Sequence, residues 1–120
     1  MEAPLTTQAR STADILSHHL ESVVAKDIDA LLSDYASDAV LLTPDGTFTG
    51  KEAIGKFFTG FAQLLTPEFL GNFALTRQEI VGDIAYIVWN SGAAVPLATD
   101  TLVCGNGLIN TQTIAAYMPS

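Results

Sequence analysis

The chain has 120 residues, of which 48% are hydrophobic and 15% charged, and its formal net charge is −8 at pH 7. This length suits one domain built around a single core, and the hydrophobic content excludes a disordered chain. Phosphate backbones and anionic headgroups repel so acidic a domain, so we expect neither a nucleic-acid partner nor a membrane partner.

Cys104 is the single cysteine, which excludes an intrachain disulfide. The start of the chain shows no basic stretch followed by an apolar run, as a secretory signal would. No apolar run approaches the ~20 residues that a helix needs to span a bilayer. We therefore expect a cytoplasmic protein with one domain over residues 1–120.

The first half of the chain is predicted to be mainly helical. Apolar residues at helical spacing follow Leu5–Thr7, with Thr6 or Thr7 as the N-cap, and His19 lies on or beside their stripe. A second helix is predicted over Ile28–Tyr35, capped by Asp27. Two short strands follow, Ala39–Thr43 and Thr47–Thr49, joined by a Pro44-Asp45-Gly46 turn. A third helix is predicted over Lys51–Leu65, and Pro67 is expected to end it.

The second half is predicted to be a meander of strands. The predicted strands are Phe69–Val81, Ile84–Val95, Thr99–Cys104 and Leu108–Tyr117. Gly82-Asp83 and Gly105-Asn106-Gly107 predict tight hairpin turns, and Pro96–Ala98 predicts a bend. Strands joined by such short turns pair antiparallel. Three helices followed by meandering strands indicate an α+β fold, in which a curved antiparallel sheet wraps over the helices and encloses a cone-shaped apolar pocket.

Two stretches resemble a known family, LLSDYASDAVLLTPDGTFTGKEAI in the first half and TDTLVCGNGLI in the second. With the order of elements, they resemble the nuclear transport factor 2-like (NTF2-like) superfamily. Within it, the SnoaL-like and ketosteroid-isomerase-like small proteins are the nearest match. The resemblance covers almost the whole chain and implies a cystatin-like curved sheet with a pocket. It does not select a function, because this fold hosts isomerases, cyclases, dehydratases, hydrolases, transport factors and assembly modules.

Residue spacing excludes several kinds of site. His18 and His19 are adjacent, so on a helix they point about 100° apart and cannot form an i, i+4 pair of metal ligands. The chain has no glycine-rich phosphate loop and no Ser-centred nucleophile elbow. We expect neither a metal nor a cofactor, which leaves acid–base chemistry or binding alone.

Asp100 is the first candidate for a catalytic residue. Strand alternation places it on the face shared by Leu102 and Cys104, toward the apolar pocket. Burial would raise its pKa, which suits a group that transfers a proton. The resemblance implies the same role, because related isomerases and cyclases use a pocket acid. Alternatively, Asp100 anchors the start of its strand by accepting hydrogen bonds from backbone amides of the Pro96–Thr99 bend.

His19 is the second catalytic candidate. In the register of the resemblance, it occupies the place of the tyrosine that binds the substrate oxyanion in ketosteroid isomerases. A histidine can donate or accept a hydrogen bond near neutral pH, so the replacement keeps some of that capability. The alternative is a half-buried histidine whose ring bonds a backbone carbonyl.

Thr43 departs from the family pattern. It stands before Pro44, where the resemblance implies the catalytic carboxylate of the isomerases. A threonine cannot act as a base near neutral pH, so we expect no steroid-type isomerase activity. Thr43 would instead orient a polar group of the ligand. Asp45 is interpreted as a turn residue rather than a replacement base.

Four further residues are predicted to line the pocket, Tyr35, Phe58, Trp89 and Leu102. Trp89 lies on the strongest predicted strand, where it forms either a pocket wall or an interface anchor. The polar strand residues Asn90, Asn110 and Gln112 face solvent, an interface or a ligand, and alternation alone does not decide between these.

Three functions stay open. The first is a cofactor-free acid–base enzyme of isomerase, cyclase or dehydratase type, acting on an apolar substrate with a carbonyl or hydroxyl. The second is a non-catalytic binding module for a small hydrophobic metabolite, and the third is an assembly domain that uses its sheet surface. The apolar content of Ile84–Val95 and Leu108–Tyr117 predicts a homodimer that packs through the outer face of these strands.

Overall fold

Helix α2 begins at a capping box. In the computed structural model, which describes residues 10–119, helix α2 spans Thr12–Ala25. Ser11 is its N-cap: the Ser11 hydroxyl accepts a hydrogen bond from the Asp14 amide at 3.0 Å, and the Asp14 carboxylate accepts one from the Ser11 amide at 3.2 Å. The predicted caps, Thr6 and Thr7, lie outside the described residues.

The second helix is shorter than predicted. Asp27 caps α3, which spans Ile28–Leu32, so the predicted cap is confirmed and the predicted end at Tyr35 is wrong. Tyr35 instead starts strand β1, Tyr35–Thr43. After the Ser33 C-cap, the Asp34 backbone carbonyl accepts from the Ile109 amide at 2.7 Å, which ties the start of β1 to the neighbouring strand β6.

The next elements are a hairpin and two helices, where one helix was predicted. Strand β2 spans Gly46–Thr49, and α4 spans Lys51–Ala62. Pro67 does not end α4; it occupies the first turn of a further short helix, α5, Pro67–Asn72. Proline suits this position because an amide in the first turn has no helical partner to lose, and the Thr66 hydroxyl caps the Phe69 amide at 3.1 Å.

Four strands complete the chain: β3 Phe73–Val81, β4 Ile84–Ser91, β5 Val95–Gly105 and β6 Leu108–Tyr117. The predicted start of the first at Phe69, and the predicted continuation of the second to Val95, are wrong. The predicted bend over Pro96–Ala98 lies inside β5. Pro96 precedes the first paired residues of β5, Leu97 with β6 and Ala98 with β4, so its missing amide costs no ladder bond.

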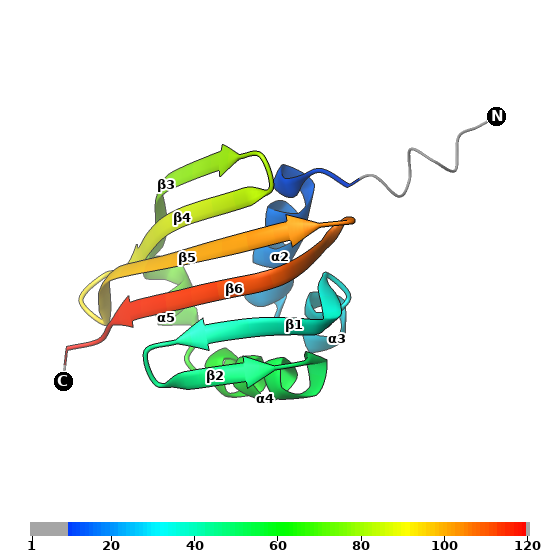
Figure 1. Ribbon diagram of the computed structural model, residues 1–120. Helices are drawn as coiled ribbons and strands as arrows, with labels where there is room; N and C mark the ends of the chain where they lie inside the picture. The colour runs from blue at the N-terminus through cyan, green and yellow to red at the C-terminus, as the bar shows by residue number, and fades with distance from the viewer. Residues whose placement is uncertain (1–9, 120) are drawn as a thin grey trace.

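The strands form one curved six-stranded sheet in the order β2-β1-β6-β5-β4-β3 (Figure 1). All neighbouring pairs are antiparallel except β1 and β6, which pair in parallel. Helices α2, α4 and α5 lie behind the sheet in this view, and the core fills the space between them and the sheet. The predicted α+β fold with a curved sheet over helices is therefore confirmed, and residues 10–119 contain the additional helix α5. None of the helices in residues 10–119 is long and apolar enough to cross a membrane.

Candidate functional site

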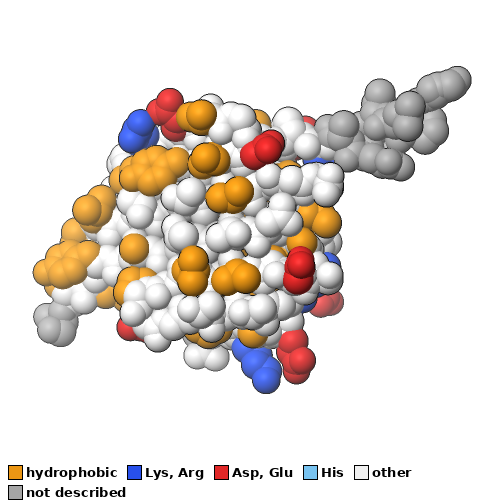
Figure 2. All heavy atoms as spheres, in the orientation of Figure 1, with side chains coloured by type: hydrophobic (Ala, Val, Ile, Leu, Met, Phe, Trp, Pro, Cys, Tyr) orange, Lys and Arg blue, Asp and Glu red, His pale blue; other side chains and the backbone are white. Residues whose placement is uncertain are grey.

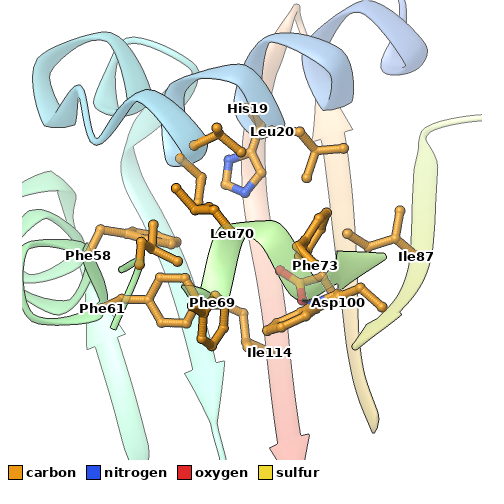
Figure 3. Close-up of a pocket in the computed structure, with 14 residues that line it drawn as sticks. His19, Leu20, Phe58, Phe61, Phe69, Leu70, Phe73, Ile87, Asp100 and Ile114 are labelled. Carbon is orange, nitrogen blue, oxygen red and sulfur yellow. Dashed lines mark hydrogen bonds between the residues drawn. The ribbon is translucent and has the colours of Figure 1, made fainter. Parts of the chain in front are cut away.

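A small cavity of about 60 Å³ lies between the sheet and the helices. Five of its lining residues are aromatic, Phe58, Phe61, Phe69, Phe73 and Trp89. Two polar side chains reach it, His19 from α2 and Asp100 from β5, and Figure 3 shows them entering from different walls. An apolar enclosure with few polar groups is the usual form of a small-molecule site.

The register of the sheet surrounds Asp100 with hydrogen-bond donors. Asp100 lies opposite Ile87 on β4 and Ile114 on β6, so Trp89 and Gln112 are its diagonal neighbours on the same face. Trp89 Nε1 donates to Asp100 Oδ1 at 2.9 Å, and Gln112 Nε2 donates to Oδ2 at 3.0 Å. These side-chain donors, rather than backbone amides of a bend, hold the carboxylate.

Asp100 is only 6% exposed, and burial raises the pKa of its carboxyl from 3.8 to about 6. The hydrogen bonds from Trp89 and Gln112 favour the ionised form and oppose this rise, but desolvation is the larger effect. Within residues 10–119, no cationic side chain lies within ion-pair distance of Asp100. Near neutral pH the group is therefore an unpaired carboxylate that is a stronger base than a surface aspartate.

Gln112 connects Asp100 to a second buried group. The Tyr35 hydroxyl donates to Gln112 Oε1, which turns the amide so that its nitrogen faces Asp100. Burial raises the pKa of Tyr35, and the Asp100 carboxylate raises it further, so the phenol stays a donor. Sequence reasoning left the orientation of Gln112 open. The available signal was its position two residues before Ile114, which places both on the inner face of β6.

His19 is 2% exposed and sits edge-on to Tyr35 and Phe58, with ring centroids 6.1 and 5.9 Å away. Its Nδ1 is buried and has no hydrogen-bond partner among the described residues. Burial lowers the pKa of His19 from 6.5 to about 4, although the Asp34 carboxylate raises it and the His18 ring lowers it further. The ring is therefore neutral near pH 7 and carries an unpartnered polar nitrogen. His19 and Asp100 form no hydrogen bond with each other.

The neighbouring histidine belongs to a different cluster. His18 Nδ1 lies 2.6 Å from Asp34 Oδ2, and Arg10 Nη1 donates to Asp34 Oδ1 at 2.7 Å. Arg10 Nη2 also donates to the Gly107 carbonyl at 2.7 Å, which fastens the start of α2 to the β5–β6 turn. Across residues 10–119, no group of three or more His, Cys, Asp or Glu side chains has the arrangement of a metal site.

The structure places four of the seven predicted site residues on the cavity wall, His19, Phe58, Trp89 and Asp100. Tyr35 and Leu102 are fully buried but lie outside the lining, and Tyr35 contributes only through Gln112.

Thr43 does not face the cavity, contrary to the prediction. Its hydroxyl donates to the Gly46 carbonyl at 3.2 Å and accepts from the Asp45 and Gly46 amides at 3.2 and 3.1 Å. The Pro44-Asp45-Gly46 turn uses these bonds to satisfy its own backbone, so the hydroxyl is held in the turn.

Solved structures share this architecture. A candidate polyketide cyclase from Sinorhizobium meliloti is 20% identical, with a TM-score of 0.69 over 84% of this chain and 93% of that one. An NTF2-like protein of unknown function from Cytophaga hutchinsonii is 11% identical, with a TM-score of 0.73 over 91% and 92%. A protein with a ketosteroid isomerase-like fold from Catenulispora acidiphila, in complex with trimethylamine, is 15% identical, with a TM-score of 0.63 over 84% and 83%. At these identities the likenesses show the fold alone.

A comparison with curated protein sequences found no match. The family model described as a SnoaL-like domain matches residues 16–103, which include His19, Thr43, Trp89 and Asp100. This match covers most of the chain, and the curved sheet over helices agrees with it. The chain therefore belongs to the SnoaL-like domain family, within the NTF2-like fold.

Proposed function

We propose that the protein is a cofactor-free acid–base enzyme of isomerase, cyclase or dehydratase type, with Asp100 as the proton-transferring group. The observation that carries this proposal is the Asp100 carboxylate itself. It is buried on an apolar cavity wall, held by two N–H donors, lacks a cationic partner among residues 10–119, and has a pKa raised to about 6. A base with a pKa near the working pH is the arrangement that proton-transfer catalysis favours.

The substrate would be apolar with one carbonyl or hydroxyl. Ionised Asp100 would take a proton from the carbon beside the carbonyl, the electron pair of that C–H bond would form the C=C bond of an enolate, and the π pair of the C=O bond would move onto the oxygen. The neutral ring of His19, on another wall, would donate a hydrogen bond to that oxygen. Asp100 would then return its proton to the same or another carbon. Membership of a family whose fold hosts cyclases and isomerases supports this reaction class by analogy.

A generic proton-transfer assay tests the proposal without knowledge of the substrate. Deuterium exchange at the carbons beside the carbonyl of acetone and 2-butanone, which are small enough for a cavity of about 60 Å³, is followed by NMR in D₂O and reports proton abstraction directly. We expect the wild type to accelerate exchange and Asp100→Asn to lose about 10²–10⁴-fold of that acceleration. Asp38→Asn, an identical change at an exposed strand residue, is the matched control and should exchange like the wild type. No acceleration by the wild type over buffer contradicts the proposal.

Binding without reaction is the second candidate function, favoured by the predominantly apolar wall. Trp89 is the single tryptophan of the chain, so its emission reports occupancy of the cavity specifically. Ketones that change Trp89 emission but exchange no protons would identify a non-catalytic module for hydrophobic metabolites.

We further propose that two copies pair through the outer face of the sheet. Figure 2 shows this face, where apolar and uncharged side chains predominate and charged ones lie toward the margins. Exposed Ile84, Leu97, Val103 and Tyr117 contribute to it, and a charge-poor apolar face supports association. Sedimentation equilibrium at micromolar concentration should give twice the chain mass, and a clean monomer would refute the pairing.

A further inference from the structure

Two hollows in this protein share a wall. The inner cavity of about 60 Å³ is the site described above, and an open groove of about 500 Å³ lies beside it, at the end of α4 and the β1–β2 turn. Phe61 and Ile114 line both hollows, so their side chains form the partition between them. Phe61 belongs to the last turn of α4, and Ile114 lies opposite Asp100 in the sheet.

The inner cavity is too small for the substrates that its chemistry suggests. One water needs about 10–15 Å³ of such space, so 60 Å³ holds about four to six water-sized groups. A ligand whose polar head reaches Asp100 and that has more than a few further atoms must therefore extend beyond this cavity.

The outer groove is chemically suited to receive such an extension. Its lining is mainly apolar, with Phe48, Phe57, Leu64 and Met118 beside the two partition residues. The Thr43 hydroxyl that borders it is already bonded within its turn, and the one charged side chain of the lining, Asp45, is exposed. Leu64 and Met118 are 43% and 51% exposed, so a ligand chain lying there would remove substantial apolar surface from water.

Resting on the proposed function, we propose that the two hollows form one binding site for an elongated ligand. Its hydroxyl or enol head donates to Asp100 in the inner cavity, and its apolar chain passes between Phe61 and Ile114 into the outer groove. Phe61 is half-buried and packs on Phe57, Phe58 and Trp89 through ring contacts at centroid distances of 6.1–6.5 Å. A rotamer change of this ring opens the partition without moving the backbone.

Straight-chain primary alcohols from 1-butanol to 1-octanol test this arrangement. They have the donor head, they lengthen by one methylene at a time, and they leave the emission of Trp89 unobscured. At pH 7.5 we expect the affinity of the wild type to rise by about fourfold per methylene through 1-octanol, the gain for transferring one CH₂ from water. Octyl methyl ether, which lacks the donor, should bind more weakly than 1-octanol.

Gly60→Leu supplies the decisive variant. Gly60 lines the outer groove but not the inner cavity, and a Cβ added there meets no atom within 4 Å. The leucine should fill the groove while favouring the helix. We expect unchanged affinity for 1-butanol and at least tenfold weaker binding of 1-octanol. Gly71→Leu is the matched control, because Gly71 is equally open, lies in α5 and lines neither hollow.

Three results overturn the inference. The first is a wild-type affinity that stops rising once the chain fills the inner cavity, and the second is a Gly60→Leu variant that binds 1-octanol as the wild type does. The third is a Gly60→Leu variant with altered sedimentation, which would assign the groove to a contact between copies. Failure of the proposed function is distinguishable, because it appears as absent deuterium exchange while the chain-length series stays intact.

Discussion

Two buried aspartates of this protein have opposite surroundings. Asp34 is fully buried and is bonded by Arg10 at 2.7 Å and His18 at 2.6 Å. Asp100 is buried almost as deeply, but it receives only neutral N–H donors, from Trp89 and Gln112. The bonds from Arg10 and His18 make Asp34 a structural link between α2 and the start of β1. A carboxylate without such partners keeps a pKa that burial can bring near neutrality.

The two adjacent histidines repeat the same contrast. His18 faces Asp34, whereas His19 faces the cavity, where burial lowers its pKa to about 4. Adjacent positions on α2 thus carry one ring bonded to Asp34 and one neutral ring with an unpartnered nitrogen, because successive side chains point about 100° apart. The cavity side of this helix is the side on which chemistry is expected.

Replacing His19 should produce the largest pH-dependent change. Its folded-state pKa of about 4 lies below the ordinary 6.5, so the wild type loses stability as pH falls through this window. The full shift corresponds to about 3 kcal/mol. His19→Leu keeps the apolar stripe and removes the titration, so its free energy of unfolding relative to wild type should rise by that amount between pH 7 and pH 4. Urea unfolding followed by Trp89 emission measures it; a pH-independent difference would contradict the burial argument.

Asp100→Asn should change the stability difference from wild type by slightly less, and this difference should grow as pH rises rather than as it falls. The folded-state pKa of Asp100 is raised from 3.8 to about 6, so its contribution to wild-type stability is present below pH 4 and is lost as pH rises through 6. The variant should gain about 3 kcal/mol relative to wild type across this window, offset by a constant cost because its amide cannot accept both N–H bonds. If Asp100→Asn unfolds at every pH, the residue is a structural anchor and its assignment as the proton-transferring group fails.

Asp34→Asn weakens the bonds that Arg10 and His18 make to this side chain. Arg10 and His18 are 33% and 40% exposed in their side chains, so they can reach water once their partner is neutral. We therefore expect a loss of about 2 kcal/mol in the free energy of unfolding, below the usual range for a fully buried pair. Deuterium exchange per folded molecule should stay at the wild-type rate. A large loss of exchange activity with stability intact would show that the two aspartates are not separable in role.

Trp89→Phe sharpens the contrast with the smallest expected effect. It keeps the aromatic wall and removes one of the donors that favour ionised Asp100. The pKa of Asp100 should rise further, by about one unit for a hydrogen bond to a charged group. Carbon-13 NMR titration of the carboxyl measures this shift. An unchanged titration would mean that Gln112 alone sets the hydrogen bonding of the carboxylate.

Local signals in the sequence predicted much of this protein. The Asp27 cap, the turn at Gly82-Asp83 and the turn around Asn106 are confirmed, and Asn106 and Gly107 adopt the positive φ values, 56° and 75°, that such a turn needs. Strand alternation also placed Asp100 on the inner face correctly. These features depend on residues within one turn or one strand, so spacing and residue type suffice to predict them.

Some sequence signals are compatible with two different structures, and at Pro67 and Thr43 the wrong one was predicted. Pro67 after a helix fits both its end and the first turn of a new helix, and the structure has the second. Thr43 was placed in the pocket through its position before Pro44, but the turn binds its hydroxyl. In both cases a hydroxyl accepts hydrogen bonds from nearby backbone amides: Thr66 from the Phe69 amide, and Thr43 from the Asp45 and Gly46 amides.

The sequence alone determined the order of helices and strands, the family and the inward direction of Asp100, because these follow from periodicity, caps and turns. The tertiary structure decided how that carboxylate is held and what lies beside it. Parallel pairing of β1 with β6 brings Tyr35 against Gln112, 77 residues away, and their hydrogen bond turns the amide toward Asp100. No local pattern encodes the contact between Tyr35 and Gln112, because it exists only after the sheet has formed and water has been excluded from these side chains.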